Sequence, residues 1–216
     1  AIGYGLNYKS KDFIKKLNED FIITEDSDFN APLLSGWPRN SLEIIFGNQK
    51  QTSDMKSKYS SLNDGSVSVE MINRFVQEDA YRVLFSEEND SFWELSSSKT
   101  LDWSEEASQS GVLSIDIRIL QSDKIKPLIF SSLCGSDCGS SFALDDSIAE
   151  NQWMNIGVDI SCMGDSGLDL AEINKPLEIS SEGAWEFEIG EIKLIGGTGG
   201  TSLMICPSSL ADRERI

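Results

Sequence analysis

The chain has 216 residues, of which 39% are hydrophobic, and its 36 acidic residues outnumber 18 basic ones for a formal net charge of −18. Such an acidic surface repels phosphate backbones and anionic lipid headgroups, so neither nucleic acid nor a membrane is an expected partner. The chain contains no histidine, which excludes catalysis and metal binding by histidine within it. No apolar run approaches the roughly 18 residues of a membrane-spanning helix.

Residues 1–20 differ in pattern from the rest of the chain. They begin without Met or a basic segment and so are not an intact signal peptide, and only Phe13 and Leu17 have the spacing of a helical turn. We expect residues 1–20 to be a tether rather than a domain of their own. Residues 21–195 are expected to form the folded domain, and residues 196–216 a Gly-rich connector and polar tail.

From residue 21 onward, short runs of strand-forming residues alternate with polar ones and are separated by Asn, Asp, Gly and Ser clusters. The clearest run is 113–120, in which every second residue is apolar. The predicted strands are 42–46, 66–72, 81–85, 92–95, 113–120, 128–132, 153–160, 177–180 and 185–194. In the last of them the apolar phase shifts by one after Ile189, which predicts a β-bulge at Gly190.

Strict period-two alternation leaves one face buried and one face wet, as is typical of antiparallel sheets. Nine short strands without a convincing helix longer than about 10 residues predict an all-β antiparallel sandwich. Connections such as residues 134–151 are too long for hairpins, which favours a jelly-roll or Greek-key topology over a meander.

The four cysteines are Cys134, Cys138, Cys162 and Cys206. Their even number and the Ser-rich composition fit an exported protein with disulfides, and the alternative is four buried thiols. We predict a Cys134–Cys138 bridge, because Cys134 ends a strand and Gly135 allows a turn that brings the Cα atoms within about 7 Å. Cys162 and Cys206 then either pair or stay reduced.

Tryptophan rings are candidate platforms for sugar rings. Trp93 and Trp103 lie beside polar, Ser-rich segments where a ring is exposed, so they are the predicted platforms; the alternative for each is a place in the core. Trp153 and Trp185 occupy apolar positions of strand patterns and are expected in the core, and Trp37 lies in a turn.

A polar segment, Gln77 to Asp79, leads into the strand that carries Arg82. Gln77 and Arg82 have the amide and guanidinium donors that bind sugar hydroxyls or the rim of a neighbouring domain. The structural alternative is a turn in which Asp79 caps nearby amides.

Acidic residues offer two further candidates. The adjacent pairs at 87–88, 105–106 and 145–146 point to opposite faces of a strand, so they are interpreted as solvated surface rather than catalytic pairs. Asp26 and Asp28 alternate in an oxygen-rich loop, where a structural calcium is the one metal considered; no other metal or cofactor is expected.

Two parts of the chain resemble family 3 glycoside hydrolases. Residues 3–8, GYGLNY, are similar to the F-G-Y-G-L-[ST]-Y element that closes the second catalytic domain of that family. Residues 76–85, VQEDAYRVLF, resemble the extra C-terminal domain of its exported bacterial members. A longer stretch, from Leu133 to Gly196, resembles the same domain. The matching positions of that stretch are Cys134, Gly135, Cys138, Gly139, Trp153, Cys162, Gly167, Asp169, Pro176 and Gly183.

This resemblance implies a galactose-binding-like jelly roll in a secreted or periplasmic β-glucosidase or exo-β-glucanase whose catalytic carboxylates lie upstream. Residues 1–20 are then the end of the preceding catalytic domain and a linker, and the domain that follows is itself non-catalytic. It docks on the upstream catalytic domains of the same polypeptide and contributes to binding of β-glucan or gluco-oligosaccharide, or to the wall of the active site. Two alternatives are an independent carbohydrate-binding module and a small carboxylate-dependent hydrolase.

Overall fold

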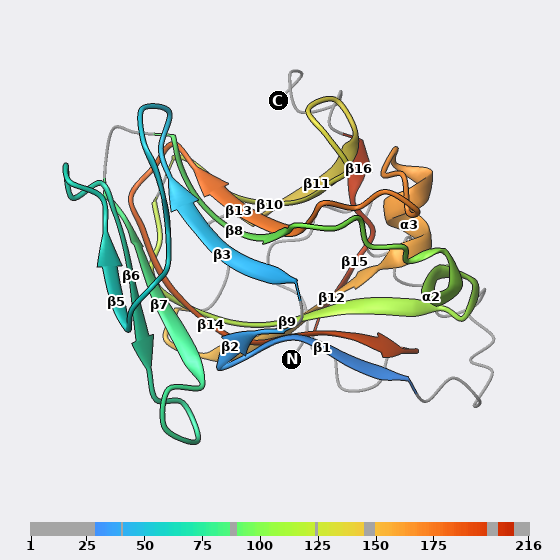
Figure 1. Ribbon diagram of the computed structural model, residues 1–216, viewed down its shortest axis with the longest axis horizontal. Helices are drawn as coiled ribbons and strands as arrows, with labels where there is room; N and C mark the ends of the chain where they lie inside the picture. The colour runs from blue at the N-terminus through green and yellow to red at the C-terminus, as the bar shows by residue number, and fades with distance from the viewer. Residues whose placement is uncertain are drawn as a thin grey trace.

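The computed structural model describes residues 29–39, 41–86, 90–123, 125–144, 150–197 and 203–209. In this part of the chain two curved β-sheets pack face to face, and two short helices lie together at one end (Figure 1). The elements are β1 (Asn30–Ser35), β2 (Trp37–Pro38), β3 (Leu42–Gly47), β4 (Thr52–Asp54), β5 (Tyr59–Ser61), β6 (Val67–Ile72), β7 (Ala80–Phe85), β8 (Ser91–Ser97), α2 (Ser104–Ser108), β9 (Gly111–Gln121), β10 (Leu128–Leu133), β11 (Gly139–Leu144), β12 (Trp153–Asp159), α3 (Ile160–Asp165), β13 (Lys175–Ser181), β14 (Trp185–Gly196), β15 (Leu203–Ile205) and β16 (Ser208–Ser209). The predicted β-sandwich is confirmed.

The nine-stranded sheet has the order β15-β12-β9-β14-β7-β6-β5, with β1 paired to β14 and β2. The seven-stranded sheet has the order β16-β11-β10-β13-β8-β3-β4. Many neighbouring strands are far apart in sequence, so the chain crosses between the sheets repeatedly, as a jelly roll does. The described pairs are antiparallel apart from β12 and β15, which run parallel.

Each of the nine predicted strands is present, and two expectations about the connections were wrong. Within residues 134–151 the chain forms β11, which pairs with β10 as an antiparallel hairpin. Part of the expected connector and tail belongs to the fold, because β15 extends the nine-stranded sheet and β16 extends the seven-stranded one. No described helix is long and apolar enough to cross a membrane.

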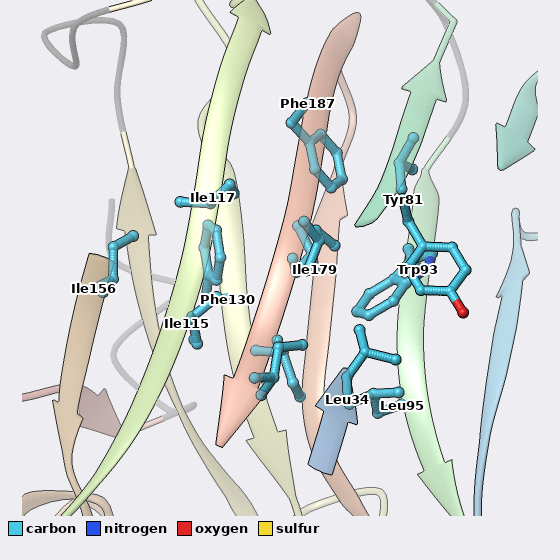
Figure 2. Close-up of a cluster of buried hydrophobic side chains, with 14 of the residues drawn as sticks. Leu34, Tyr81, Trp93, Leu95, Ile115, Ile117, Phe130, Ile156, Ile179 and Phe187 are labelled. Atoms are coloured by element: carbon cyan, nitrogen blue, oxygen red, sulfur yellow. The ribbon is translucent and has the colours of Figure 1, made fainter. Parts of the chain in front are cut away.

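The core lies between the inner faces of the two sheets. In β9 the side chains of Leu113, Ile115 and Ile117 are fully buried, as the alternation predicted. Figure 2 shows the cluster that they form with residues of the opposite sheet such as Phe130 and Ile179. Burying each such side chain contributes about 1.5–3 kcal/mol, so this cluster is the main source of stability.

The predicted bulge at Gly190 is confirmed. Ile189 of β14 pairs with Ile117 of β9, and the next pair is Ile192 with Ile115, so Gly190 and Glu191 of β14 lie opposite a single residue of β9, Asp116. The bulge also divides β14 on its other edge. Residues before it pair with β7, and residues after it pair with β1.

Two disulfides join segments at the edge of the sandwich. Cys134 pairs with Cys138 across the β10–β11 turn with a Cα–Cα distance of 5.1 Å, the pairing expected from the sequence. Cys162 in α3 pairs with Cys206 directly after β15, with a Cα–Cα distance of 5.3 Å. The second bridge holds the C-terminal strands against the body of the domain.

Candidate functional site

The two predicted sugar platforms, Trp93 and Trp103, are buried, so that prediction was wrong. Trp93 is 0% exposed on the inner face of β8, within the cluster of Figure 2. Trp103 is 3% exposed at the N-cap of α2, where its backbone N–H donates to Leu170. Neither ring can stack on a sugar. The period-two pattern places Trp93 in phase with buried Leu95, a signal more informative than the polarity of nearby loops.

Of the other three tryptophans, one is buried as expected, one is not in the core as expected, and one has an exposed ring. Trp185 is buried as predicted, but Trp153 lies on the outer face of the nine-stranded sheet, opposite Arg118 in β9. Trp37 is 48% exposed in β2, which makes it an exposed ring available for contact. From the sequence, Trp37 was assigned only to a turn, because it lies between a glycine and a proline. The same turn explains why no neighbouring strand covers its ring.

The segment with Gln77 is the loop 73–79, which joins β6 to β7 and projects from one end of the sandwich (Figure 1). Asp79 accepts hydrogen bonds from the backbone N–H groups of Arg74, Phe75 and Val76, at 2.6, 2.8 and 3.0 Å. Partial burial opposes ionisation of this carboxyl, but the backbone donors outweigh it and hold the pKa of Asp79 below its ordinary value. Asp79 therefore caps the loop, as the structural alternative proposed.

The same loop presents apolar side chains to solvent. Phe75 is 80% exposed and Val76 is also exposed, although the backbone that carries them is tied down. Gln77 is exposed too, and its amide donates to Glu78 at 3.3 Å. A rigid loop that displays an aromatic ring loses little conformational entropy when it binds, so it is well suited to make a contact.

A cleft of about 380 Å³ separates this loop from β2. Trp37 and Arg39 line one side, and Val76, Gln77 and Glu78 line the other. The cleft thus combines an exposed indole with amide, guanidinium and carboxylate groups. We call it the Trp37 cleft. Of the residues that line the cleft, Gln77 was predicted from the sequence and Trp37 was not. The available signal for the neighbouring loop was the apolar pair Phe75 and Val76 in an otherwise polar segment.

The base of the loop is anchored on the outer face of the nine-stranded sheet. Arg74 forms an ion pair with Asp116 of β9, and its guanidinium lies 4.4 Å from the centroid of the Phe75 ring. A Cβ at Gly190 would overlap Nη1 of Arg74, so the bulge glycine provides the space in which this guanidinium sits.

Arg82, the other predicted donor, does not line the Trp37 cleft. It lies on the outer face of β7, where its Nη2 donates to Oε1 of Glu188 at 2.8 Å. Glu188 is fully buried and also pairs with Arg118. Its hydrogen bond raises the pKa of Arg82, so this guanidinium is already engaged in an ion-pair network.

The structure brings two carboxylates together on the outer face of the seven-stranded sheet. Glu94 of β8 and Glu178 of β13 are direct cross-strand partners, and Nζ of Lys175 lies 2.6 Å from Glu94 and 3.3 Å from Glu178. Burial raises the pKa of Glu94 even though Lys175 favours its charged form. No sequence signal identifies this pair, because the two residues meet only through the register of distant strands.

Of the adjacent acidic pairs, Glu105 and Glu106 lie in the first turn of α2, and the pairs 87–88 and 145–146 lie outside the described residues. The calcium candidates Asp26 and Asp28 lie outside them as well. Among the residues that are described, no three His, Cys, Asp or Glu side chains come together in a way that could hold a metal ion.

Two curved, mainly antiparallel sheets with crossed connections define the class of this domain as a galactose-binding-like β-sandwich. The sequence model of the Exop_C family, described as galactose-binding domain-like, matches residues 43–194, which is more than half of the chain. The chain belongs to this family. A search of curated proteins finds no match.

Three solved structures show the same fold. The extra C-terminal domain (X) of exo-1,3/1,4-β-glucanase (ExoP) from a Pseudoalteromonas species matches with a TM-score of 0.68 and 15% identity over 82% of this chain and 98% of that domain. The whole ExoP enzyme matches with a TM-score of 0.69 and 15% identity over 85% of this chain, which covers 22% of the enzyme. The family 30 carbohydrate-binding module of the cellulosomal cellulase Cel9D-Cel44B of Clostridium thermocellum matches with a TM-score of 0.56 and 11% identity over 79% of this chain and 99% of the module.

Proposed function

We propose that this chain is the non-catalytic accessory domain of a secreted or periplasmic family 3 exo-β-glucanase or β-glucosidase. In this proposal the domain docks on the catalytic domains of the same polypeptide, and the Trp37 cleft contributes to the wall that faces the bound glucan. Membership of the Exop_C family and the likeness to domain X of ExoP support an accessory role. The two disulfides are typical of an oxidising compartment.

The loop 73–79 is the observation that carries the proposal. It holds Phe75 and Val76 in solvent on a backbone that Asp79 fixes, so these two apolar side chains lie outside the core of the domain. Exposed apolar side chains gathered on an ordered projection are a mark of an interaction site. Beside them, the ring of Trp37 and the amide of Gln77 supply the stacking surface and the hydrogen-bond donor that a glucose unit requires.

The experiment uses the full-length parent enzyme with Gln77→Ala or Trp37→Ala, assayed on gluco-oligosaccharides and on an aryl β-glucoside. If the cleft faces the glucan, each variant raises KM for the oligosaccharides by about fivefold or more and changes KM for the aryl glucoside less, because the small substrate does not extend to the cleft. Gln109→Ala removes an exposed amide beside α2, at the end of the sandwich away from the loop, and is the matched control.

Unchanged oligosaccharide kinetics in both variants would contradict a role at the active-site wall. The purified chain alone is expected to release no nitrophenol from the aryl glucoside. Its converging carboxylates, Glu94 and Glu178, are both paired with Lys175 and so are not arranged as an acid and a nucleophile.

A further inference from the structure

A second cleft, of about 340 Å³, lies on the outer face of the seven-stranded sheet, where β8 and β13 approach their ends. We propose that it is a separate binding site for a neutral oligosaccharide, with the ring of Phe92 as the stacking surface and Glu178 as a hydrogen-bond acceptor. The site goes beyond the proposed function, since it needs no catalytic domain beside it. We call it the Phe92 cleft.

The ring of Phe92 is held against the sheet. Phe92 points outward from β8, and its direct partner on β3 is Gly47. A Cβ at Gly47 would lie 2.9 Å from two carbons of the Phe92 ring, so the ring leans over the glycine and occupies the space that a side chain would fill. It lines the cleft together with Ile129 of β10. These two residues give the cleft an apolar surface fixed by the backbone below it.

Polar groups are fixed around this surface. Glu178 and Ser180 line the cleft from β13, and Lys175 holds the carboxylate of Glu178 from one side. Asn48 forms the rim, where its Nδ2 donates to Asp64 and Ser66 and its Oδ1 accepts from the backbone of Lys50 and Gln51. The lining is therefore arranged before a ligand arrives, which lowers the entropic cost of binding.

The charges of the cleft select the class of ligand. Asp90, Glu178 and Glu182 contribute carboxylates to the lining. The lysines beside it are already paired with acids, Lys175 with Glu178 and Glu94, and Lys126 with Glu182, so the net charge of the cleft stays negative. Phosphate, sulfate and uronate groups are repelled by such a lining. A neutral sugar ring offers C–H groups to Phe92 and hydroxyl donors to the carboxylates, and the volume lies within the range of roughly 300–1,000 Å³ that is usual for ligand pockets.

The Phe92 cleft and the Trp37 cleft lie at opposite ends of β7, since loop 73–79 precedes that strand and Asp90 lies just before β8 (Figure 1). The six residues of β7 span about 20 Å. A glucan chain can therefore occupy the Phe92 cleft while the loop end of the domain is in contact with another domain.

The test is isothermal titration of the purified chain with laminarihexaose and cellohexaose, a choice of probes that rests on the proposed function. We expect Phe92→Ala to weaken binding by about tenfold or more, and Phe92→Leu, which preserves packing against Gly47, to weaken it similarly. Glu178→Gln should weaken it about threefold. Tyr59→Ala removes an exposed ring from β5, at the edge of the other sheet and outside both clefts, and should leave binding unchanged.

Three results would overturn this inference: no heat of binding at ligand concentrations on the order of 5 mM, equal affinity of Phe92→Leu and the unsubstituted chain, or an equal loss of affinity in Tyr59→Ala. A fourth arm uses penta-lysine, since an acidic cleft also suits a basic peptide. Peptide binding that weakens strongly between about 0.05 and 0.5 M salt, without sugar binding, would assign the cleft to a cationic partner instead. Kinetics of Gln77→Ala in the parent enzyme are unaffected by these outcomes, so the two proposals fail separately.

Discussion

The guanidinium of Arg74 lies over the ring of Trp153, with 4.0 Å between its Cζ atom and the ring centroid. The same guanidinium pairs with Asp116 and fills the space above Gly190. One side chain thus connects the exposed loop 73–79 to the bulge in β14 and to two strands of the larger sheet. This contact determines how firmly the loop is held.

Arg74→Ala should lower the free energy of unfolding by about 2 kcal/mol, because it removes the stacked cation and leaves Asp116, which still accepts from Asn155, without its ion-pair partner. Hydrogen exchange in residues 73–79 should accelerate at the same time. Arg39→Ala removes the same charge from an exposed position of the Trp37 cleft and should change stability by less than about 0.5 kcal/mol. Equal effects of the two substitutions would show that Arg74 does not anchor the loop.

The loop should also respond to pH through Asp79. Because its pKa is lower in the folded chain than the unfolded value of about 3.9, its contribution is complete above that value and is lost as the pH falls through the folded-state pKa. We expect the amides of Phe75 and Val76 to lose protection as the pH falls below about 4, measured by hydrogen exchange corrected for intrinsic rates.

Asp79→Asn is the control for this response. Its side chain has one acceptor oxygen, which can replace either Oδ1, the acceptor for Arg74, or Oδ2, the acceptor for Phe75 and Val76, but not both. The loop should therefore already be less protected at pH 7 and should show little further change on acidification. A variant with the same protection as the unsubstituted chain would rule out the capping role.

Substitution of a buried and of an exposed tryptophan should lower the free energy of unfolding by different amounts. Trp93→Ala should cost about 3–5 kcal/mol in chemical denaturation, because a fully buried ring leaves a cavity between the sheets. Trp37→Ala should cost less than about 1 kcal/mol, because half of its ring is already in water. If the two values were similar, the assignment of Trp37 as a ligand contact would lose its basis.

The two disulfides should contribute unequally. Chain-entropy arguments give about 2 kcal/mol for the Cys134–Cys138 bridge, whose sequence separation is 4, and about 4 kcal/mol for Cys162–Cys206, whose separation is 44. Paired Cys→Ser variants measure this difference in denaturation curves. Peptide mapping under non-reducing conditions checks the pairing, and a Cys134–Cys162 linked peptide would contradict it.

Nine of the described strands, and the buried face of those with clear alternation, could be predicted from the sequence. Alternation such as Leu113, Ile115, Ile117 is a local property of a few consecutive residues, and the fold simply places the apolar face inward. The bulge at Gly190 was predictable for the same reason, since a change of phase within one strand must be accommodated by extra residues. The burial of Trp185 follows from its phase in β14.

Contacts between distant segments were decided only by the tertiary structure. The sequence does not specify that Glu94 faces Glu178, or that Trp153 lies under Arg74, because register and strand order depend on pairing across the whole sandwich. Polar neighbours in the sequence were a poor guide to exposure: Trp103 is buried because it is enclosed by the core, and Trp37 is exposed because nothing packs over its turn. Both candidate clefts are lined by segments that are distant in the sequence, so their residues become recognisable only in the folded chain.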